Sequence, residues 1–306
     1  MEKRMKRKSS VKMSKSDHTI MAVIYLFLTV LAISCIIPFL YVIGSSFQTQ
    51  NDILRNGYRI IPKDFTLETY RLIFMAPKKL IDAYLVTIII TIVGTLAGLW
   101  VTATYGYVIS RKSYSLRNML SFFVFFTMLF NGGLVPTYIL MVKWLHLKDN
   151  LLALIIPGMC SAWNILLMKG FFRDIPESLI ESAKMDGGSE LIIFSKIVIP
   201  ISKPVFATIG LFLILGYWNS WYESMLYMDS SNKVSLQYLL VTMMRNIELL
   251  NSPEAQQYGM VIQGYEAPTL GARMAMAVLA TGPIVFVFLT LQKYFISGIT
   301  VGAVKE

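Results

Sequence analysis

Six stretches of this 306-residue chain contain no Asp, Glu, Lys or Arg over 19 to 28 consecutive residues. A helix needs about 20 apolar residues to cross the hydrocarbon core of a bilayer, which is about 30 Å thick. A barrel strand would be shorter and would alternate in polarity, and these runs do not alternate. We therefore expect an all-α, polytopic membrane protein with six transmembrane helices, in the windows 20–43, 83–110, 118–142, 150–168, 204–222 and 274–292.

The composition supports this class. Charged residues make up 15% of the chain, against about 25% in an ordinary soluble protein. Such a chain lacks the charge to cover a water-facing surface, and it is far too apolar to be disordered. Its two cysteines, Cys35 and Cys160, both lie in apolar runs. They predict neither a disulfide framework nor a metal site.

The first window follows a basic leader, as the apolar core of a signal peptide would. Its apolar run is much longer than the 7 to 15 residues or so of a signal peptide, and no small-residue cleavage site follows it. We interpret it as an uncleaved first span. The leader occupies residues 1–19 and carries seven basic residues, Lys3, Arg4, Lys6, Arg7, Lys8, Lys12 and Lys15.

The basic residues predict the orientation. With six spans, the segments on the same side as the termini hold 17 Lys and Arg, and the opposite segments hold 11. Positive charge accumulates on the cytoplasmic side of membrane proteins. Both termini are therefore expected in the cytoplasm of a bacterial cell. The net charge of +10 is interpreted as this topology signal and not as nucleic-acid binding, which would need a basic face on a soluble module.

The segment 169–203, on the cytoplasmic side, is unusually long and polar. Asp174, Pro176 and Glu177 predict a helix start, and the helix should end near Met185. Ser189 can then cap a second short helix. We expect Gly187 and Gly188 to terminate the first helix and Pro200 to stop the second. The product is a helix–turn–helix knob too small to fold alone, whose apolar residues need a surface to bury against: Leu179, Ile180, Leu191, Phe194 and Ile197.

Here the sequence resembles a known family. The run Glu181-Ser182-Ala183-Lys184-Met185-Asp186-Gly187-Gly188, with Phe194, Ile199-Pro200 and Pro204 after it, is similar to the E-A-A-x-x-D-G-A loop of binding-protein-dependent ABC importer permeases. The departures from the pattern are Ser182, Gly188 and Ile199. Further motifs resemble the carbohydrate branch, on the side of the second maltose-permease subunit: Asn131 to Tyr138, Gly216 to Tyr222 and the tail from Gln292 to Glu306.

The resemblance implies a permease domain at 20–296, with the loop 169–203 inside it, and a cytoplasmic tail at 297–306. It also implies a second permease subunit, two separate ATPase subunits that bind ATP and Mg²⁺, and an extracytoplasmic solute-binding protein. The loop would couple the ATPases to the spans, through Glu181, Ala183, Asp186, Gly187, Gly188, Phe194 and Pro200. For each of these residues alone, a purely structural role as a turn or a cap is an equal alternative.

Four residues are candidates for the substrate pathway: Asn131, Asn164, Trp218 and Asn219. Asn219 lies 15 residues beyond Pro204, so a helix would carry it about 22 Å from the inner boundary. An amide at that depth favours a protein-lined or water-filled cavity, and an aromatic–amide pair suits a sugar. The alternative is that the neighbouring aromatic residues form an interfacial belt.

No enzyme site is expected. His18 and His146 stand apart without metal-ligand spacing, and the chain has no phosphate-binding loop of the G-x-x-x-x-G-K-[ST] type. The chain should bind no cofactor itself, and ATP hydrolysis must occur on another polypeptide. Two alternatives stay open: an ABC permease for a non-sugar solute, and a stand-alone secondary transporter. The second is disfavoured because the windows lack the ionisable residues that proton coupling uses.

Overall fold

The computed structural model describes residues 15–74, 77–250 and 270–303. Within these ranges the chain is helical, and its only β-type pairing is a single bridge between Gln48 and Phe65. Three helices are individually long and apolar enough to cross a bilayer. They are α1 (Lys15–Ser45), α4 (Pro77–Ser110) and α16 (Leu270–Ala303).

The other apolar windows are occupied by bent helix pairs. The bend is 113° between α5 (Arg117–Leu129) and the segment formed by α6 (Leu134–Ile139) and the π-helical turn η1 (Leu140–Trp144). It is 45° between α7 (Leu152–Met159) and α8 (Ala162–Arg173). The third bend, of 82°, separates α12 (Lys203–Trp218) from a segment made of α10 (Glu190–Ile193), the π-helical turn η2 (Phe194–Val198) and α11 (Ile199–Ile201). Counting each pair as one span gives up to six spans, the number predicted, and in the third pair α12 alone lies in the predicted window 204–222.

The spans pack through small residues on α4. A Cβ added at Gly98 would lie 3.1 Å from Leu213 of α12, and one added at Gly106 would lie 3.1 Å from Met168 of α8. A Cβ at Gly94 would collide with the ring of Tyr217. Small residues let the backbones of membrane helices approach closely. This face of α4 is therefore the centre of the bundle, and α12 and α8 lie against it.

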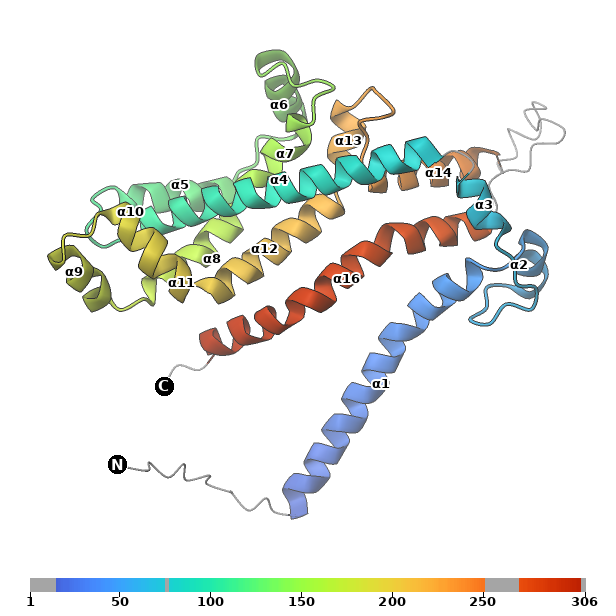
Figure 1. Cartoon of the computed structure of the whole chain (residues 1–306), viewed down its shortest axis with the longest axis horizontal. Helices are drawn as coiled ribbons and strands as arrows, with labels where there is room; N and C mark the ends of the chain where they lie inside the picture. Colours follow the sequence, from blue (N-terminus) through green and yellow to red (C-terminus); the bar gives the residue numbers. More distant parts are fainter. Residues whose placement is uncertain (1–14, 75–76, 251–269, 304–306) are drawn as a thin grey trace.

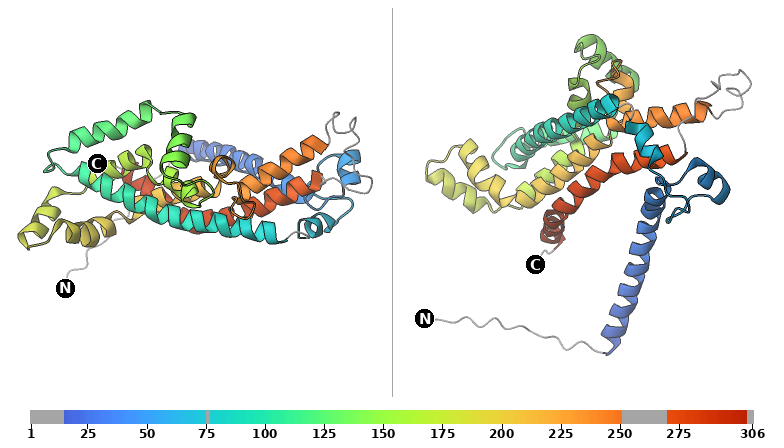
Figure 2. Two further views of the ribbon diagram at one scale, coloured as in Figure 1. Left: turned by 90° about the horizontal axis from the view of Figure 1, so that it is seen from above. Right: turned by 45° about the vertical axis from the view of Figure 1, so that its right-hand side comes forward.

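Short helices cover the two ends of the bundle (Figures 1 and 2). At one end, called the α9 end, lie α9 (Glu177–Met185) and α10. At the other end, called the α2 end, lie α2 (Gln50–Asn56), α3 (Glu68–Phe74) and α14 (Leu236–Leu250). A lobe of α6, η1, α7 and α13 (Tyr222–Tyr227) projects from the side.

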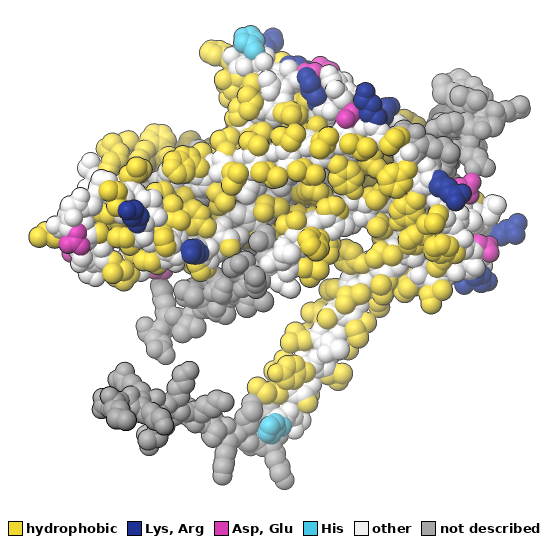
Figure 3. All heavy atoms as spheres, in the orientation of Figure 1, with side chains coloured by type: hydrophobic (Ala, Val, Ile, Leu, Met, Phe, Trp, Pro, Cys, Tyr) yellow, Lys and Arg dark blue, Asp and Glu magenta, His cyan; other side chains and the backbone are white. Residues whose placement is uncertain are grey.

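Helix α1 leaves the bundle at an angle and contacts α16 (Figure 1; Figure 2, right). The 18-residue window that qualifies α1 as a span contains no buried residue. Hydrophobic side chains cover α1 and the middle of the bundle, whereas charged side chains gather at the two ends and on the lobe (Figure 3). This is the charge distribution expected of a chain that spans a membrane.

The element boundaries differ from the predicted domain limits at both ends. Helix α1 begins at Lys15, inside the predicted leader 1–19, because the helix extends past the apolar run into polar residues. Helix α16 continues to Ala303, so most of the predicted tail 297–306 belongs to the last helix. The remaining residues of the leader and the tail, 1–14 and 304–306, lie outside the described residues.

Candidate functional site

The first helix of the predicted knob is α9, and it ends as the sequence predicts. Gly187 has φ +79°, the left-handed region that glycine adopts without strain. Its N–H donates to the Lys184 carbonyl at 3.0 Å, and the Gly188 N–H donates to the Ala183 carbonyl at 2.9 Å. These two bonds form a Schellman motif, which satisfies the last carbonyls of the helix. A Cβ at Gly188 would lie 2.7 Å from the Ala183 oxygen, so this turn requires both glycines.

The second helix begins as predicted but does not end at Pro200. The Ser189 side chain accepts a hydrogen bond from the Ile192 N–H at 3.4 Å and caps α10. Pro200 then lies in the first turn of α11, and the chain bends at Ser202. The prediction of a stop was wrong because the preceding residues form a π-helical turn. The helical register restarts there, and a proline in a first turn loses no hydrogen bond.

The predicted start of α9 was also wrong in its details. Asp174 is the C-cap of α8, and Pro176 occupies the N-cap position of α9 without a side-chain hydrogen bond. Glu177 makes no reciprocal cap. Its carboxylate accepts a hydrogen bond from Lys112 at 3.0 Å, in the turn after α4. A tertiary ion pair has replaced the local capping arrangement.

The knob, residues 177–201, is tied to the bundle by charged and polar contacts. The Tyr107 hydroxyl of α4 donates to Glu190 Oε2 at 2.6 Å. Lys184 of α9 pairs with the other oxygen of Glu190, also at 2.6 Å. The Lys112–Glu177 pair adds a second link. The hydrogen bond from Lys112 holds the pKa of Glu177 below its usual range, so the Glu177 carboxylate is charged in this pair at neutral pH.

The knob also shares the hydrophobic core of the spans. Ile180 of α9 and Phe194 of η2 are buried in a cluster with Phe172 and Tyr107. The Phe194 ring lies 5.0 Å from the Tyr107 ring and 6.4 Å from the Phe172 ring. The sequence placed Phe194 among the coupling residues, and the structure places it inside, where it anchors the knob. The knob therefore moves with the ends of α4 and α8.

The outward side of the knob combines exposed apolar and charged residues. Met185 is 88% exposed and Leu191 is 71% exposed. Glu181, Asp186 and Gly187 are also exposed, as is Pro200, whereas Ala183 is half-buried. Large apolar side chains at a polar membrane boundary are typical of a protein contact. The knob therefore presents a mixed apolar and charged surface to its surroundings.

Two of the four pathway candidates are exposed. Asn131 lies in the break between α5 and α6, where its Oδ1 accepts a hydrogen bond from the Gly133 N–H at 2.9 Å. Asn219 is the C-cap of α12, and its Nδ2 donates to the Leu215 carbonyl at 2.9 Å. Both amides lie where helices break. Irregular backbone at membrane depth is tolerated only against protein or a water-filled cavity.

The other two candidates are buried among helices of this chain. The Trp218 Nε1 donates to the Ala280 carbonyl of α16 at 2.9 Å, and the indole packs in a cluster with Leu236 and Met276. Asn164 of α8 is 6% exposed. The structure thus exposes two of the four candidates and buries the other two. In this conformation Trp218 joins α12 to α16.

Sequence reasoning missed the tethers of the knob and a clip in the projecting lobe. No local signal distinguishes Tyr107 from the other hydroxyl-bearing residues near the end of that apolar span, such as Tyr105 and Ser110. The clip centres on Asp149, which accepts hydrogen bonds from Ser230 Oγ at 2.6 Å and from Lys233 Nζ at 2.9 Å. Its φ is +57°, in the left-handed region that Asp enters more easily than most residues. This clip joins the segment before α7 to the one after α13.

Comparisons with known proteins agree with this architecture. Residues 73–301 match a family described as the binding-protein-dependent transport system inner membrane component. The polygalacturonan/rhamnogalacturonan transport system permease protein YtcP of Bacillus subtilis is 39% identical over 92% of this chain and 96% of its own length. Protein LplC of the same organism is 41% identical over 88% of this chain and 89% of its own length.

A solved structure is similar in fold. It is described as a bacterial ABC transporter involved in the import of the acidic polysaccharide alginate. One of its chains superposes with a TM-score of 0.76 at 28% sequence identity, covering 92% of this chain and 99% of that one. The resemblance inferred from the inner loop is thereby confirmed. This chain belongs to the family of binding-protein-dependent transport system inner membrane components.

Proposed function

We propose that this chain is a permease subunit that carries an oligosaccharide across the bacterial cytoplasmic membrane, with the knob at residues 177–201 as its contact with a separate ATPase. One observation carries the proposal. The knob is fixed to α4 by Tyr107, Glu190 and Lys112, yet it presents Met185, Leu191 and Glu181 to a partner. A rigid, exposed element of this kind can transmit motion from another subunit into the spans.

The proposal also includes the orientation of the chain in the membrane and its partner subunits. The excess of Lys and Arg places the α9 end in the cytoplasm, where ATP is available. The α2 end then faces outward, toward a solute-binding protein. A second permease subunit completes the pathway, and two ATPase subunits bind the knobs. The permease chain contributes no phosphate-binding loop, so ATP and Mg²⁺ are held by the ATPases.

The carbohydrate class is supported by two of the similar proteins named above, the permease protein YtcP and the alginate importer, whose descriptions name polysaccharides. Among the pathway candidates, Asn131 and Asn219 are exposed at helix breaks and can offer amide hydrogen bonds to hydroxyls. We assign them the pathway role ahead of the buried Trp218 and Asn164. Alternating access would then expose these amides first to the outside and then to the cytoplasm.

Uptake of a labelled oligogalacturonide by cells that contain the complete transporter tests the proposal. Glu181→Lys and Gly187→Asp should each lower uptake by at least about tenfold, as expected when an interfacial charge or contact surface is changed. Both variants should still insert in the membrane at the normal level. The matched control is Glu68→Lys, an exposed charge reversal on α3 at the opposite end, which should keep the ATPase in the purified transporter, whereas Glu181→Lys should lose it.

Each result separates the alternatives. Normal uptake by both knob variants would contradict the coupling role. Uptake that persists after ATP depletion would identify a secondary transporter. Uptake of labelled amino acids or peptides instead of the oligogalacturonide would identify another solute class.

A further inference from the structure

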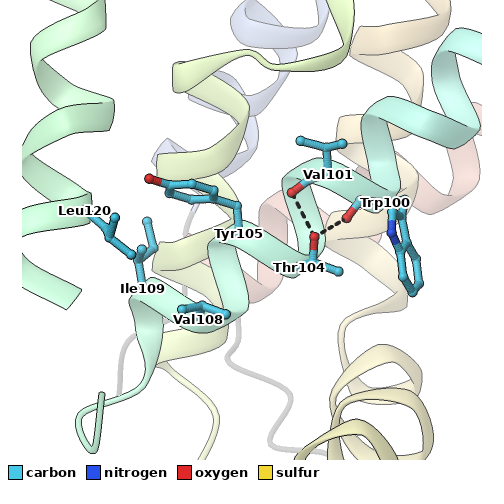
Figure 4. A pocket seen from close by; sticks show the side chains of 7 residues that line it. All are labelled: Trp100, Val101, Thr104, Tyr105, Val108, Ile109 and Leu120. Carbon is cyan, nitrogen blue, oxygen red and sulfur yellow. Dashed lines mark hydrogen bonds between the residues drawn. The ribbon is translucent and has the colours of Figure 1, made fainter. Parts of the chain in front are cut away.

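An open apolar groove lies on α4 next to the start of α5 (Figure 4). Its volume is about 340 Å³, and it is lined by Trp100, Val101, Thr104, Tyr105, Val108, Ile109 and Leu120. The Thr104 hydroxyl is already bonded to the carbonyls of Trp100 and Val101, at 2.8 and 3.2 Å. The groove therefore suits a hydrocarbon ligand better than a polar one.

The groove belongs to the side of α4 that faces away from the bundle. Large exposed apolar residues recur along that side at helical spacing from one end of α4 to the other: Ile81, Leu85, Ile88, Ile92, Leu96, Trp100 and Val108. The opposite side carries the glycines that pack against α12 and α8. Interfaces between membrane helices favour small residues. The contrast indicates that no described helix of this chain covers the groove, which leaves it open toward the lipid.

Three cations gather near one end of this groove. Lys169 of α8 donates to Ser121 Oγ of α5 at 2.8 Å, and both Arg173 and Arg117 lie close enough to act on its ammonium group. In the described part of the chain, the ion pairs are formed by other cations, namely Lys112, Lys148, Lys184 and Lys233. Arg117 also acts on the carboxyl of Glu177, which is itself paired with Lys112. None of the three cations has a carboxylate within ion-pair distance in the described residues, and this excess of positive charge favours the binding of an anion.

Helix geometry connects the cations with the groove. Arg117, Leu120, Ser121 and Val124 are spaced at i, i+3, i+4 and i+7, so they lie on one face of α5. Leu120 lines the groove on that face, and Arg117 lies one turn before it. Arg117 is also the first residue of α5, whose N-cap Leu116 offers no side-chain acceptor. The positive end of the helix dipole adds to the attraction for an anion.

The dimensions fit one leaflet of a bilayer. The lining residues of α4 run from Trp100 to Ile109, and the nine helical rises between these two residues span about 13 Å along the helix. One leaflet contributes about 15 Å of hydrocarbon, half of the core thickness. The cations follow directly at the α9 end, where lipid phosphates would lie. An acyl chain and a phosphate on one molecule match the two halves of this site.

We propose that the groove and the cations Arg117, Lys169 and Arg173 form a binding site for one anionic phospholipid of the inner leaflet. Its acyl chain lies along α4 between Trp100 and Leu120, and its phosphate contacts the cations at the start of α5 and the end of α8. The assignment to the inner leaflet rests on the orientation given under the proposed function. The bound lipid braces α5 against α8, whose C-cap Asp174 lies three residues before the knob begins at Glu177.

Native mass spectrometry of the purified transporter, loaded with phosphatidylglycerol or with phosphatidylcholine of the same chains, tests the site. The wild-type protein should retain phosphatidylglycerol preferentially. The double variant Arg117→Gln/Lys169→Gln should weaken that retention by about fivefold for each cation removed. Lys196→Gln, an exposed cation on η2, is the matched control and should retain the lipid normally.

A second variant tests the groove without touching the cations. Val108→Trp should fill the groove and lower phosphatidylglycerol retention while the transporter elutes normally from gel filtration. Equal retention of the two lipids, or normal retention by the double variant, would overturn the proposal. Displacement of the lipid by inorganic phosphate would also overturn the proposal, because it would show that the cations bind a phosphate group without an acyl chain in the groove. Loss of another subunit in Val108→Trp would show that the groove is a protein interface.

The lipid site and the coupling role can fail separately. Glu181→Lys should lose uptake but retain phosphatidylglycerol. In vesicles that carry phosphatidylglycerol only in the leaflet next to the α2 end of the protein, the transporter should not retain this lipid. If it is retained, the orientation is wrong and the site binds lipid of the opposite leaflet.

Discussion

The Tyr107 hydroxyl connects a membrane-spanning helix to the knob through Glu190. Tyr107→Phe removes this hydrogen bond, worth about 1 kcal/mol for a partly exposed pair, and keeps the ring that packs on Phe194. We expect ATP hydrolysis to continue while fewer sugar molecules are transported per ATP. The measurement is uptake and hydrolysis in the same proteoliposomes. Tyr105→Phe, two residues earlier on α4, should leave the ratio unchanged, and an unchanged ratio in Tyr107→Phe would show that this bond transmits nothing.

Substitutions at Gly187 can show whether a glycine is needed there for the left-handed backbone conformation or for contact with the partner subunit. The Gly187 φ of +79° is accessible to Asn but costly for a β-branched residue. Gly187→Asn should therefore keep the Schellman turn and most of the uptake, whereas Gly187→Val should lose uptake. The check is the initial rate of sugar uptake at equal membrane content. Equal loss in both variants would mean that the partner, and not the turn, requires a glycine here.

At the scale of single residues, the sequence predicted the caps and turns that depend on neighbouring residues. It did not predict the side-chain contacts that are made with residues far away in the chain. The Ser189 cap and the glycine turn depend on neighbours within a few residues, so their motifs were sufficient. Glu177 was predicted as a cap residue but pairs with Lys112, 65 positions away. Trp218 was a pathway candidate, and its partner Ala280 lies on a helix that no local motif connects to it.

Among the elements, the lobe of α6, α7 and α13 depends on the Asp149 clip. Asp149→Asn removes the charge that pairs with Lys233 and weakens the clip. Hydrogen exchange should then accelerate at residues 228–233. Asp229→Asn breaks a more exposed pair with Lys148 and is the control with a smaller effect. Unchanged exchange in Asp149→Asn would mean that backbone contacts alone hold the lobe.

The pH dependence of the clip follows from the same residue. Hydrogen bonds from Ser230, and then from Lys233, hold the pKa of Asp149 well below its ordinary value. A lowered carboxyl pKa stabilises the folded lobe above the ordinary value of about 3.9. That stabilisation is lost as pH falls through the lowered pKa. Exchange at residues 228–233, corrected for intrinsic rates, should therefore stay constant from pH 8 to pH 5. A rise within this range would contradict the assignment.

The end of α12 separates packing from substrate contact. Trp218→Phe loses the bond to Ala280 and should lower the thermal stability of the purified transporter, with little change in KM. Asn219→Ala removes an exposed amide and should raise the KM for sugar without lowering stability. Thermal unfolding and uptake kinetics on both variants check this division. A raised KM with unchanged stability in Trp218→Phe would instead indicate that Trp218 contacts the sugar.

The same scale shows why six apolar windows did not give six straight helices. Asn131, Gly132 and Gly133 lie at the break in the third window, but nothing local specifies the bend of 113° there. The bend depends on distant contacts, such as the stacking of Tyr138 on Tyr227 of α13. Hydropathy reports how many residues can lie in lipid, and the path of the chain depends on which helices pack.

Across the whole molecule, charge and apolar surface divide its tasks. Hydrophobic side chains cover the middle, and charged side chains mark the two ends and the lobe (Figure 3). The α9 end combines a tether to the spans with an exposed apolar tip. The central claim is that this tip docks on an ATPase in the cytoplasm.

Site-directed cross-linking from the tip tests that claim most directly. Met185 is 88% exposed at the end of α9, and Cys35 and Cys160 can first be replaced by serine to give a clean background. Met185→Cys, carrying a short photo-cross-linker, should form an adduct with the ATPase subunit in inside-out vesicles, and the yield should change when ATP binds. The account would be contradicted if no adduct with the ATPase formed and if an impermeant thiol reagent labelled Met185→Cys from the outside of intact cells. Together these results would place the tip on the outer side of the membrane.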